Sequence, residues 1–382
     1  MVVDVRGGES MRSVAGRFAV PLSTVQHWVA QARGKRLDRV NWQDRSCAPS
    51  RTRRTPPSVE RRVLAARKQL KDHSPLGEYG AEAIWRELQR QVPTLPCPRT
   101  IGRILERHGL LDGRKRVRRP PPPTGWYLPE VGARICELDC FDTIEGLAIR
   151  GGPHLSVLTG ISLYGGLAAS WPARRVSAVT VVEALLEHWQ FCGLPGYAQF
   201  DNDNRFVGPR QHPNAIGRVI RLCLCLNVTP VFAVPNETGF QAAIESFNGR
   251  WQAKVWNRFE HARLHDLRQQ SGRYITASRQ RHAVRIEQAP ARTPVPNGWQ
   301  LNLQSKPCGK IIFLRRTNGS GALEILGNSF VVDRDWVHRL VRAEVDLDQQ
   351  FIQFFALRRR APHDQPLLNQ VPYQLPNKRF LE

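Results

Sequence analysis

The sequence predicts a protein of several domains: N-terminal all-α modules of the helix-turn-helix kind, a central α/β mixed sheet flanked by helices, and a small C-terminal β-barrel. Three observations support this prediction. The chain has 382 residues, more than one ordinary domain contains. Helical apolar periodicity gives way near residue 130 to alternating strands and helices, and near residue 291 to short strands with tight turns. Pro- and Arg-rich stretches separate the helical parts.

These changes of texture divide the chain into seven segments. They are a helix-turn-helix module at 1–40, a linker at 41–56, a second helix-turn-helix-like module at 57–112, a basic and Pro-rich linker at 113–129, an α/β core at 130–290, a small β-barrel at 291–360 and a tail at 361–382.

The charge is uneven along the chain. The formal net charge is +23, and residues 1–130 hold 26 Lys and Arg against 12 Asp and Glu. A basic N-terminal third beside a nearly balanced centre favours DNA-anchoring modules joined to a core whose acids offset its bases. A basic protein of the ribosomal type is the alternative.

Several other classes are disfavoured. No apolar run approaches the ~20 residues of a membrane span, and the start lacks the apolar stretch of a signal peptide. The eight cysteines are scattered without the paired spacing of a zinc site, so we expect reduced thiols in a cytoplasmic protein with no membrane partner.

The first module carries two apolar stripes at helical spacing, namely Val14, Ala15 and Phe18, then Val25, Trp28 and Val29. Residues 19–22 form the turn, with Pro21 near the start of the second helix. That helix would present four polar residues to a major groove: Ser23, Thr24, Gln26 and His27. Any two amphipathic helices with a short turn would give the same pattern. A supporting helix before this helix pair is expected to be shortened, because the chain begins just before the pair.

The second module is predicted to contain helices at 59–70 and 79–91 and a third that opens at Pro98 and stops near Gly109. Its exposed face carries Arg99, Thr100 and Arg103 as candidate DNA contacts.

The remaining elements follow from periodicity and turn residues. Expected core strands are 134–141, 154–161, 166–171, 197–200 and 228–234, and expected core helices are 177–191, 213–226, 239–257 and 261–287. Short strands of the barrel are expected at 309–316, 322–326, 330–333, 337–343 and 350–357.

Three acids stand out in the core. Asp139 and Asp201 each end a strand-like apolar run, and Glu245 lies inside an otherwise apolar helix pattern. Carboxylates on these elements can converge on hard divalent cations, and two such ions can clamp both oxygens of an in-line phosphoryl displacement. Each acid alone could be a helix cap or a solvated strand end. Asp142 is a rival for the first ligand, although Asp139 is better aligned with the apolar run.

These motifs resemble the acidic triad of the retroviral-integrase-like transposases, the bacterial insertion-sequence enzymes with a ribonuclease-H-like core. The resemblance covers roughly residues 130–290. It implies that Asp139, Asp201 and Glu245 are the catalytic residues and bind Mg²⁺ or Mn²⁺, as two ions. It further implies cleavage that frees a 3′ hydroxyl and transfer of that strand to a target, and thus DNA integration, recombination and transposition. The implied partners are double-stranded DNA and further copies of the chain, and the implied location is the bacterial nucleoid.

Neighbouring residues complete the expected site. Asn202 and Asn248 would support the ligands, and Arg250 and Lys254 would hold DNA, with Trp251 either stacking on a base or packing in the core. The chain departs from the family pattern at Asp203, where Gly is usual, and at Gln252, where a basic residue is common. The spacing from Asp201 to Glu245, 245 − 201 = 44 positions, is also longer than the commonest arrangement.

Two other functions fit part of the pattern. One is a catalytically inactive or repurposed sequence-specific DNA-binding regulator of transposition. The other is a nuclease of the same fold acting on RNA–DNA hybrids, which the helix-turn-helix modules disfavour because such helices fit duplex DNA.

Overall fold

The computed structural model describes residues 1–43, 55–89, 91–92, 94–111, 124–209, 212–237 and 239–376. The chain divides into two compact units, Met1–Pro57 and Ser58–Glu382. Most of each predicted linker lies outside the described residues. Where the chain is described, no helix combines the length and apolar character that a membrane crossing requires, and the cysteines there carry free thiols.

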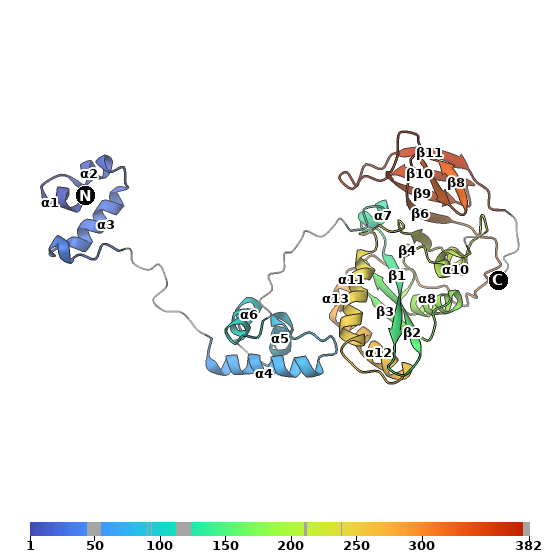
Figure 1. The fold of residues 1–382 in the computed structure, drawn as a ribbon, viewed down its shortest axis with the longest axis horizontal. Helices are drawn as coiled ribbons and strands as arrows, with labels where there is room; N and C mark the ends of the chain where they lie inside the picture. The colour runs from blue at the N-terminus through green and yellow to red at the C-terminus, as the bar shows by residue number, and fades with distance from the viewer. Residues whose placement is uncertain are drawn as a thin grey trace. The chain divides into compact units, whose positions relative to one another are not determined.

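The first unit consists of helices α1 (Val2–Arg6), α2 (Met11–Arg17) and α3 (Leu22–Ala32) and the 3₁₀ turn η1 (Leu37–Arg39) (Figure 1). Ser10 caps α2 by accepting a hydrogen bond from the Ser13 N–H. Val14 of α2 packs against Val25 of α3, as the two apolar stripes predict. Phe18 departs from its stripe and is exposed, because α2 ends one residue before it. The helix pair is therefore present.

The second unit begins with three helices that share one apolar core. They are α4 (Pro57–His73), α5 (Ala81–Leu88) and α6 (Pro98–Arg107). Val63, Ile84 and Ile104 are fully buried between them. Gly109 adopts a φ of 64° just after α6, a left-handed conformation that Gly reaches without steric cost.

The remainder of the second unit is a mixed α/β fold built on one large sheet. Its first strands are β1 (Leu138–Ala148), β2 (His154–Ser162), β3 (Ala168–Ala173), β4 (Tyr197–Phe200) and β5 (Thr229–Phe232). The first three strands form an antiparallel meander, and β1, β4 and β5 pair in parallel. The strand order β3-β2-β1-β4-β5 makes β1 the central strand of this group.

Helices cover both faces of these strands. One face packs against α8 (Ala178–Cys192), α9 (Asn204–Val207) and α10 (Arg218–Cys225). The other packs against α11 (Ala242–Trp251), the π-helical turn η2 (Gln252–Trp256) and α12 (Leu264–Arg281). Two short helices, α7 (Pro129–Gly132) and α13 (Ala283–Glu287), complete the set. Because side chains alternate between faces along a strand, neighbouring residues of β1 enter different cores.

The C-terminal strands differ from the small β-barrel that the sequence predicts. The strands are β6 (Lys310–Arg316), β9 (Leu340–Asp346), β10 (Phe351–Ala356) and β11 (Leu367–Pro372), with β7 (Ala322–Ile325) and β8 (Asn328–Val331) as a separate hairpin. β6 pairs in parallel with β5, so the order β11-β10-β9-β6 extends the core sheet to nine strands (Figure 1). β11 also lies in the predicted tail.

The C-terminal strands join the core sheet because the edge of β5 is open to pairing. Short strands and tight turns specify hairpins, but they do not specify which edge a hairpin will meet. Without β6, β5 would present a row of unpaired backbone groups. The rings of Phe232 on β5 and Phe313 on β6 also stack, with centroids 5.1 Å apart.

This joint core makes a prediction for stability. Phe313→Ala should lower the free energy of unfolding of the Ser58–Glu382 unit by about 3–5 kcal/mol, because a fully buried ring is removed. Urea unfolding should show the core strands and the C-terminal strands lost in one transition. Phe191→Ala, at a ring that is 76% exposed, is the matched control and should change little. Separate melting of the C-terminal strands would contradict the joint core.

Candidate acidic active site

The pairing of β1 with β4 decides which acids can meet. Its register matches Leu138 with Tyr197, Asp139 with Ala198 and Cys140 with Gln199. Continuing this register by two positions places Asp142 next to Asp201, the residue that directly follows β4. Asp139 and Asp142 are three residues apart, so their side chains point to opposite faces of β1.

Helix α11 reaches Asp142 through an asparagine. Asn248 Nδ2 donates to Asp142 Oδ2 at 2.8 Å, and the Thr159 hydroxyl on β2 donates to Asn248 Oδ1 at 2.7 Å. Glu245 lies one turn before Asn248 on the same side of α11. The predicted supporting role of Asn248 therefore has a defined contact, and that contact brings α11 to Asp142 instead of Asp139.

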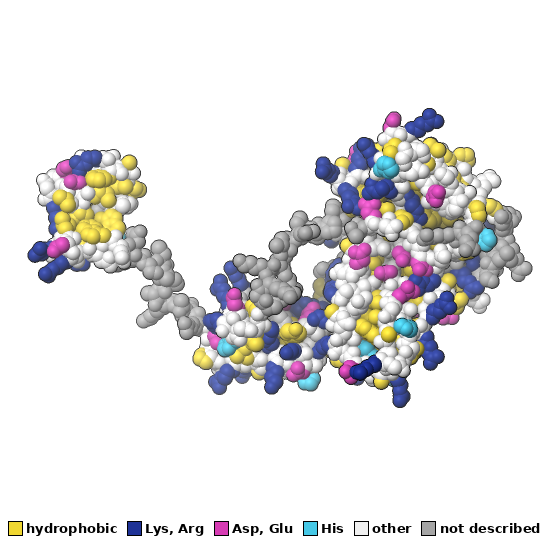
Figure 2. Space-filling view, viewed as in Figure 1, with side chains coloured by type: hydrophobic (Ala, Val, Ile, Leu, Met, Phe, Trp, Pro, Cys, Tyr) yellow, Lys and Arg dark blue, Asp and Glu magenta, His cyan; other side chains and the backbone are white. Residues whose placement is uncertain are grey.

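Electrostatics shows the same grouping. Burial raises the pKa of Asp142 to about 6, and repulsion from the Asp201 and Glu245 carboxylates adds to the rise. The Thr143 N–H, which donates to Asp142 Oδ1 at 2.7 Å, acts in the opposite direction. Asp201 and Glu245 thus lie near enough to Asp142 for their charges to raise its pKa, and we call these three residues the acidic cluster. Acidic side chains gather over the region of β1 and α11 in the space-filling view (Figure 2).

A cavity of about 640 Å³ lies beside this cluster. Asp201 and Glu245 both line it, together with Asp203 and Glu237. Asp201 is half-buried and Glu245 is exposed. A charged ligand can therefore reach these two carboxylates from solvent.

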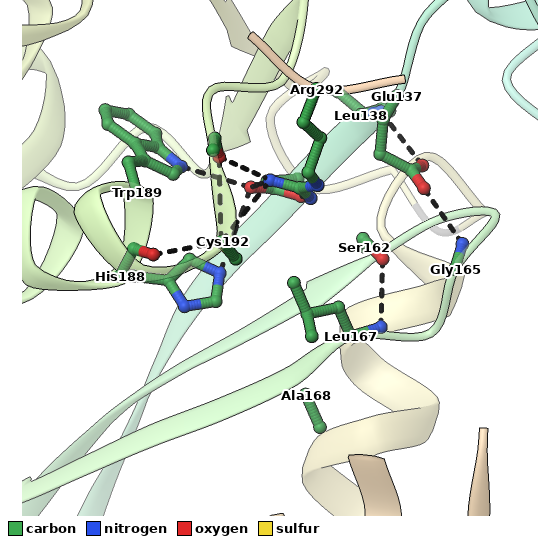
Figure 3. A network of polar contacts seen from close by, with 12 residues as sticks. Glu137, Leu138, Ser162, Gly165, Leu167, Ala168, His188, Trp189, Cys192 and Arg292 are labelled. Atoms are coloured by element: carbon green, nitrogen blue, oxygen red, sulfur yellow. Dashed lines mark hydrogen bonds and ion pairs between the residues drawn. The ribbon is translucent and has the colours of Figure 1, made fainter. Parts of the chain in front are cut away.

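The structure does not bring Asp139 to the other acids, so its predicted role as a metal ligand stays a prediction that no contact here supports. Its side chain is 1% exposed and forms an ion pair with Arg292. Arg292 lies near Trp189 and His188 of α8 (Figure 3). Trp189, on α8, donates from its Nε1 to Asp139 Oδ2 at a distance of 3.1 Å. The sequence pattern suggests that the strand ends near Asp139, whereas β1 continues to Ala148. Asp139 lies buried on the α8 side of the sheet.

His188 adds no charge to this pair. Its Nε2 lies 4.0 Å from Asp139 Oδ2. Burial lowers the pKa of His188 to about 4, and this effect exceeds the opposite influence of Asp139. The imidazole is therefore neutral near pH 7, and Arg292 supplies the positive charge that balances Asp139.

The residues after Asp201 form a braced turn. Asn202 Nδ2 donates to the Ala233 carbonyl at 2.6 Å, and Arg315 on β6 donates to Asn202 Oδ1 at 2.8 Å. Asp203 caps α9 by accepting from the Arg205 N–H at 2.8 Å. Asn202 thus links Asp201 to β5 and to the C-terminal strands.

The candidate DNA contacts fall into two groups. Those with exposed side chains are Ser23, Gln26 and His27 on α3, Arg99 and Arg103 on α6, and Arg250 on α11, whereas Thr24 and Thr100 are half-buried. Lys254 Nζ donates to the Gly77 carbonyl at 2.9 Å, so a contact within the chain engages this ammonium group. Trp251 is fully buried and donates to Ser271 Oγ, which identifies it as core packing.

The donor set has the chemistry of a hard-cation site. Carboxylate oxygens are the ligands that Mg²⁺ and Mn²⁺ prefer, and Mg²⁺ takes many of its ligands from water and substrate phosphate. Within the described ranges, no three His, Cys, Asp or Glu side chains are close enough to enclose a metal ion. The mutual repulsion of Asp142, Asp201 and Glu245 is the feature that a cation would relieve.

Sequence reasoning ranked Asp142 below Asp139 as the first ligand and missed the contributions of Arg292 and Arg315. Asp142 could be found by counting the register of two parallel strands, since Asp201 follows β4 directly. Arg292 and Arg315 lie 153 and 113 positions from their partners, and no local pattern signals such contacts.

Comparisons with known proteins give a weak likeness. The sequence matches no family model, and a search of curated proteins finds no match. Among solved structures, the catalytic core domain of BIV integrase has 15% identity and a TM-score of 0.28, with 37% of this chain and 81% of that chain covered. A chain of the simian T-cell lymphotropic virus intasome with the PP2A regulatory subunit B56 gamma has 14% identity and a TM-score of 0.32, with 72% and 88% covered. The HTLV-2 integrase catalytic core domain with magnesium has 10% identity and a TM-score of 0.26, with 36% and 82% covered.

Proposed function

We propose that this protein is a divalent-metal-dependent polynucleotidyl phosphoryl transferase of the transposase or integrase kind. It would cleave DNA to free a 3′ end and transfer that strand to target DNA. The observation that supports this function is the convergence of β1, β4 and α11, which groups Asp142, Asp201 and Glu245. The Asn248 hydrogen bond to Asp142 holds the third element in place.

In this proposal Asp142, Asp201 and Glu245 hold Mg²⁺ or Mn²⁺, as two ions. The metal, when bound, would stabilise the charge that develops on the phosphate oxygens. Asn248 fixes the Asp142 carboxylate from one side, and the Thr143 N–H fixes it from the other. Each carboxylate oxygen has two lone-pair positions, so a single hydrogen bond leaves capacity for a cation.

The basic helical modules would bind double-stranded DNA through α3 and α6, and copies of the chain would assemble on paired DNA ends. The net charge of +23 supports a polyanionic partner. The alternative, a regulator that binds DNA without chemistry, shares the modules and differs only at the acidic cluster.

A first prediction separates these two functions. Asp142→Asn, Asp201→Asn and Glu245→Gln should each reduce joining at least about 100-fold, because each removes a charged metal ligand. The assay would combine the full chain with a duplex from the DNA that borders its gene, a supercoiled target and Mg²⁺ or Mn²⁺. DNA binding measured in EDTA should remain as in the unmodified protein. Binding without metal-dependent nicking or joining by the unmodified protein would favour the regulator.

A second prediction distinguishes Asp139 from Asp142. Asp139→Asn should lower the free energy of unfolding by about 3–5 kcal/mol, because it leaves the Arg292 guanidinium without its buried counter-charge. Asp142→Asn should change stability less than Asp139→Asn does, because the repulsion from Asp201 and Glu245 that it removes offsets the one accepted hydrogen bond, from Asn248 or Thr143, that an amide cannot keep. Urea unfolding at pH 7 would measure both.

The decisive comparison is the joining activity per folded molecule of the Asp139→Asn and Asp142→Asn variants. Below its unfolding temperature, Asp139→Asn should retain joining that Asp142→Asn has lost. If Asp139→Asn folded normally and lost joining, the metal-ligand role would return to Asp139.

A further inference from the structure

A second cavity, of about 690 Å³, lies on another face of α11. Three arginines line it, Arg134, Arg250 and Arg285, and none of its described lining residues is Asp or Glu. The cavity beside Asp201 and Glu245 has the opposite character, with four carboxylates on its wall. The start of α11 separates two sites of opposite charge.

The arginine cavity is built from positions that the fold holds in place. Arg285 donates to the carbonyls of Leu163 and Tyr164, which fixes its guanidinium against the turn after β2. Arg134 lies over the Tyr164 ring with its guanidinium carbon 4.9 Å from the ring centre. Arg134 also has a φ of 59°, a conformation that costs free energy for a residue other than Gly.

Arg250 connects this cavity to the acidic cluster. It lies five positions after Glu245 on α11, and its Nε donates to the Ser246 carbonyl at 3.2 Å. Ser246 also lines the arginine cavity, whereas Glu245 lines the acidic one. One turn of helix therefore carries groups directed at both.

We infer that the arginine cavity binds a backbone phosphate of the DNA strand that occupies the acidic site. Guanidinium groups bind phosphate through charge-assisted hydrogen bonds. A strand with one phosphate at the acidic cluster can continue across α11, which lines both cavities, and positive charge without competing carboxylates favours its next phosphates there. The inference rests on the proposed function for the identity of the strand, and its test does not require catalysis.

The test measures the salt dependence of DNA binding by the full chain in EDTA, with a labelled duplex and fluorescence anisotropy. Arg134→Gln and Arg250→Gln should each weaken binding and make the slope of log K against log salt shallower by roughly 1, because each removes one phosphate contact. Arg150→Gln is the matched control: it removes the same charge from an exposed position outside the cavity. Its slope should stay as in the unmodified protein.

A phosphate scan locates the contact. Neutral methylphosphonate linkages, placed one at a time in the duplex, should weaken binding at a particular position, and this effect should disappear in Arg134→Gln. Thermal unfolding verifies that both cavity variants are folded.

Three outcomes would overturn the inference. The first is a slope for both cavity variants equal to that of Arg150→Gln. The second is a scan in which no linkage depends on Arg134. The third is stabilisation of the unmodified protein by inorganic phosphate, lost in Arg134→Gln while the DNA slope stays unchanged; the cavity would then hold free phosphate. If the unmodified protein shows no joining while the salt slopes and the phosphate scan come out as expected, only the proposed function is contradicted.

Discussion

The parallel pairing of β1 with β4 is the constraint on which the candidate site depends. Its register sends Asp139 toward α8 and places Asp142 beside the residue that follows β4. A slip of one residue would exchange the two faces of β1, because side chains alternate along a strand. The slip would also move Phe141, which is fully buried in the α8-side core, to the face that packs against α11. Packing of the apolar residues of β1 therefore fixes the register that also positions Asp139 and Asp142.

Burying the ion pair of Asp139 and Arg292 costs free energy of desolvation. Removing two charges from water is expensive, and their attraction offsets this only when hydrogen bonds satisfy the remaining atoms. Here Trp189 Nε1 and the Gly193 carbonyl supply such bonds, the first to Asp139 and the second to Arg292. Because Arg292 follows the last core helix, the pair ties the segment leading to β6 back to the central strand. It thus helps to direct the C-terminal strands to the open edge of β5.

Local patterns in the sequence predict much of the fold and two of the three clustered acids. The helices of both N-terminal modules and the strands β2, β4 and β5 follow from periodicity, since each buries one continuous face or run. Asp201 and Glu245 follow because each stands next to such a run. The joining of β6 to β5 and the choice of Asp142 were not predictable in this way, since both depend on which strands pair and in which register. Polar residues in the second half of β1, such as Glu145, also hide its full length from a search for apolar runs.

The opposite charges on α11 explain how one helix can serve both a cation and a polyanion. A carboxylate cluster alone would repel a phosphate, and an arginine cluster alone would repel a metal ion. In the proposed function, a separation of about one helical turn would let each group act on its own partner, and the short distance would couple them through one strand of DNA. The π-helical turn η2 follows α11 directly, and Trp251 and Val255, at the junction and within the turn, are both buried. The packing of these two side chains thus anchors the end of the helix that presents both groups.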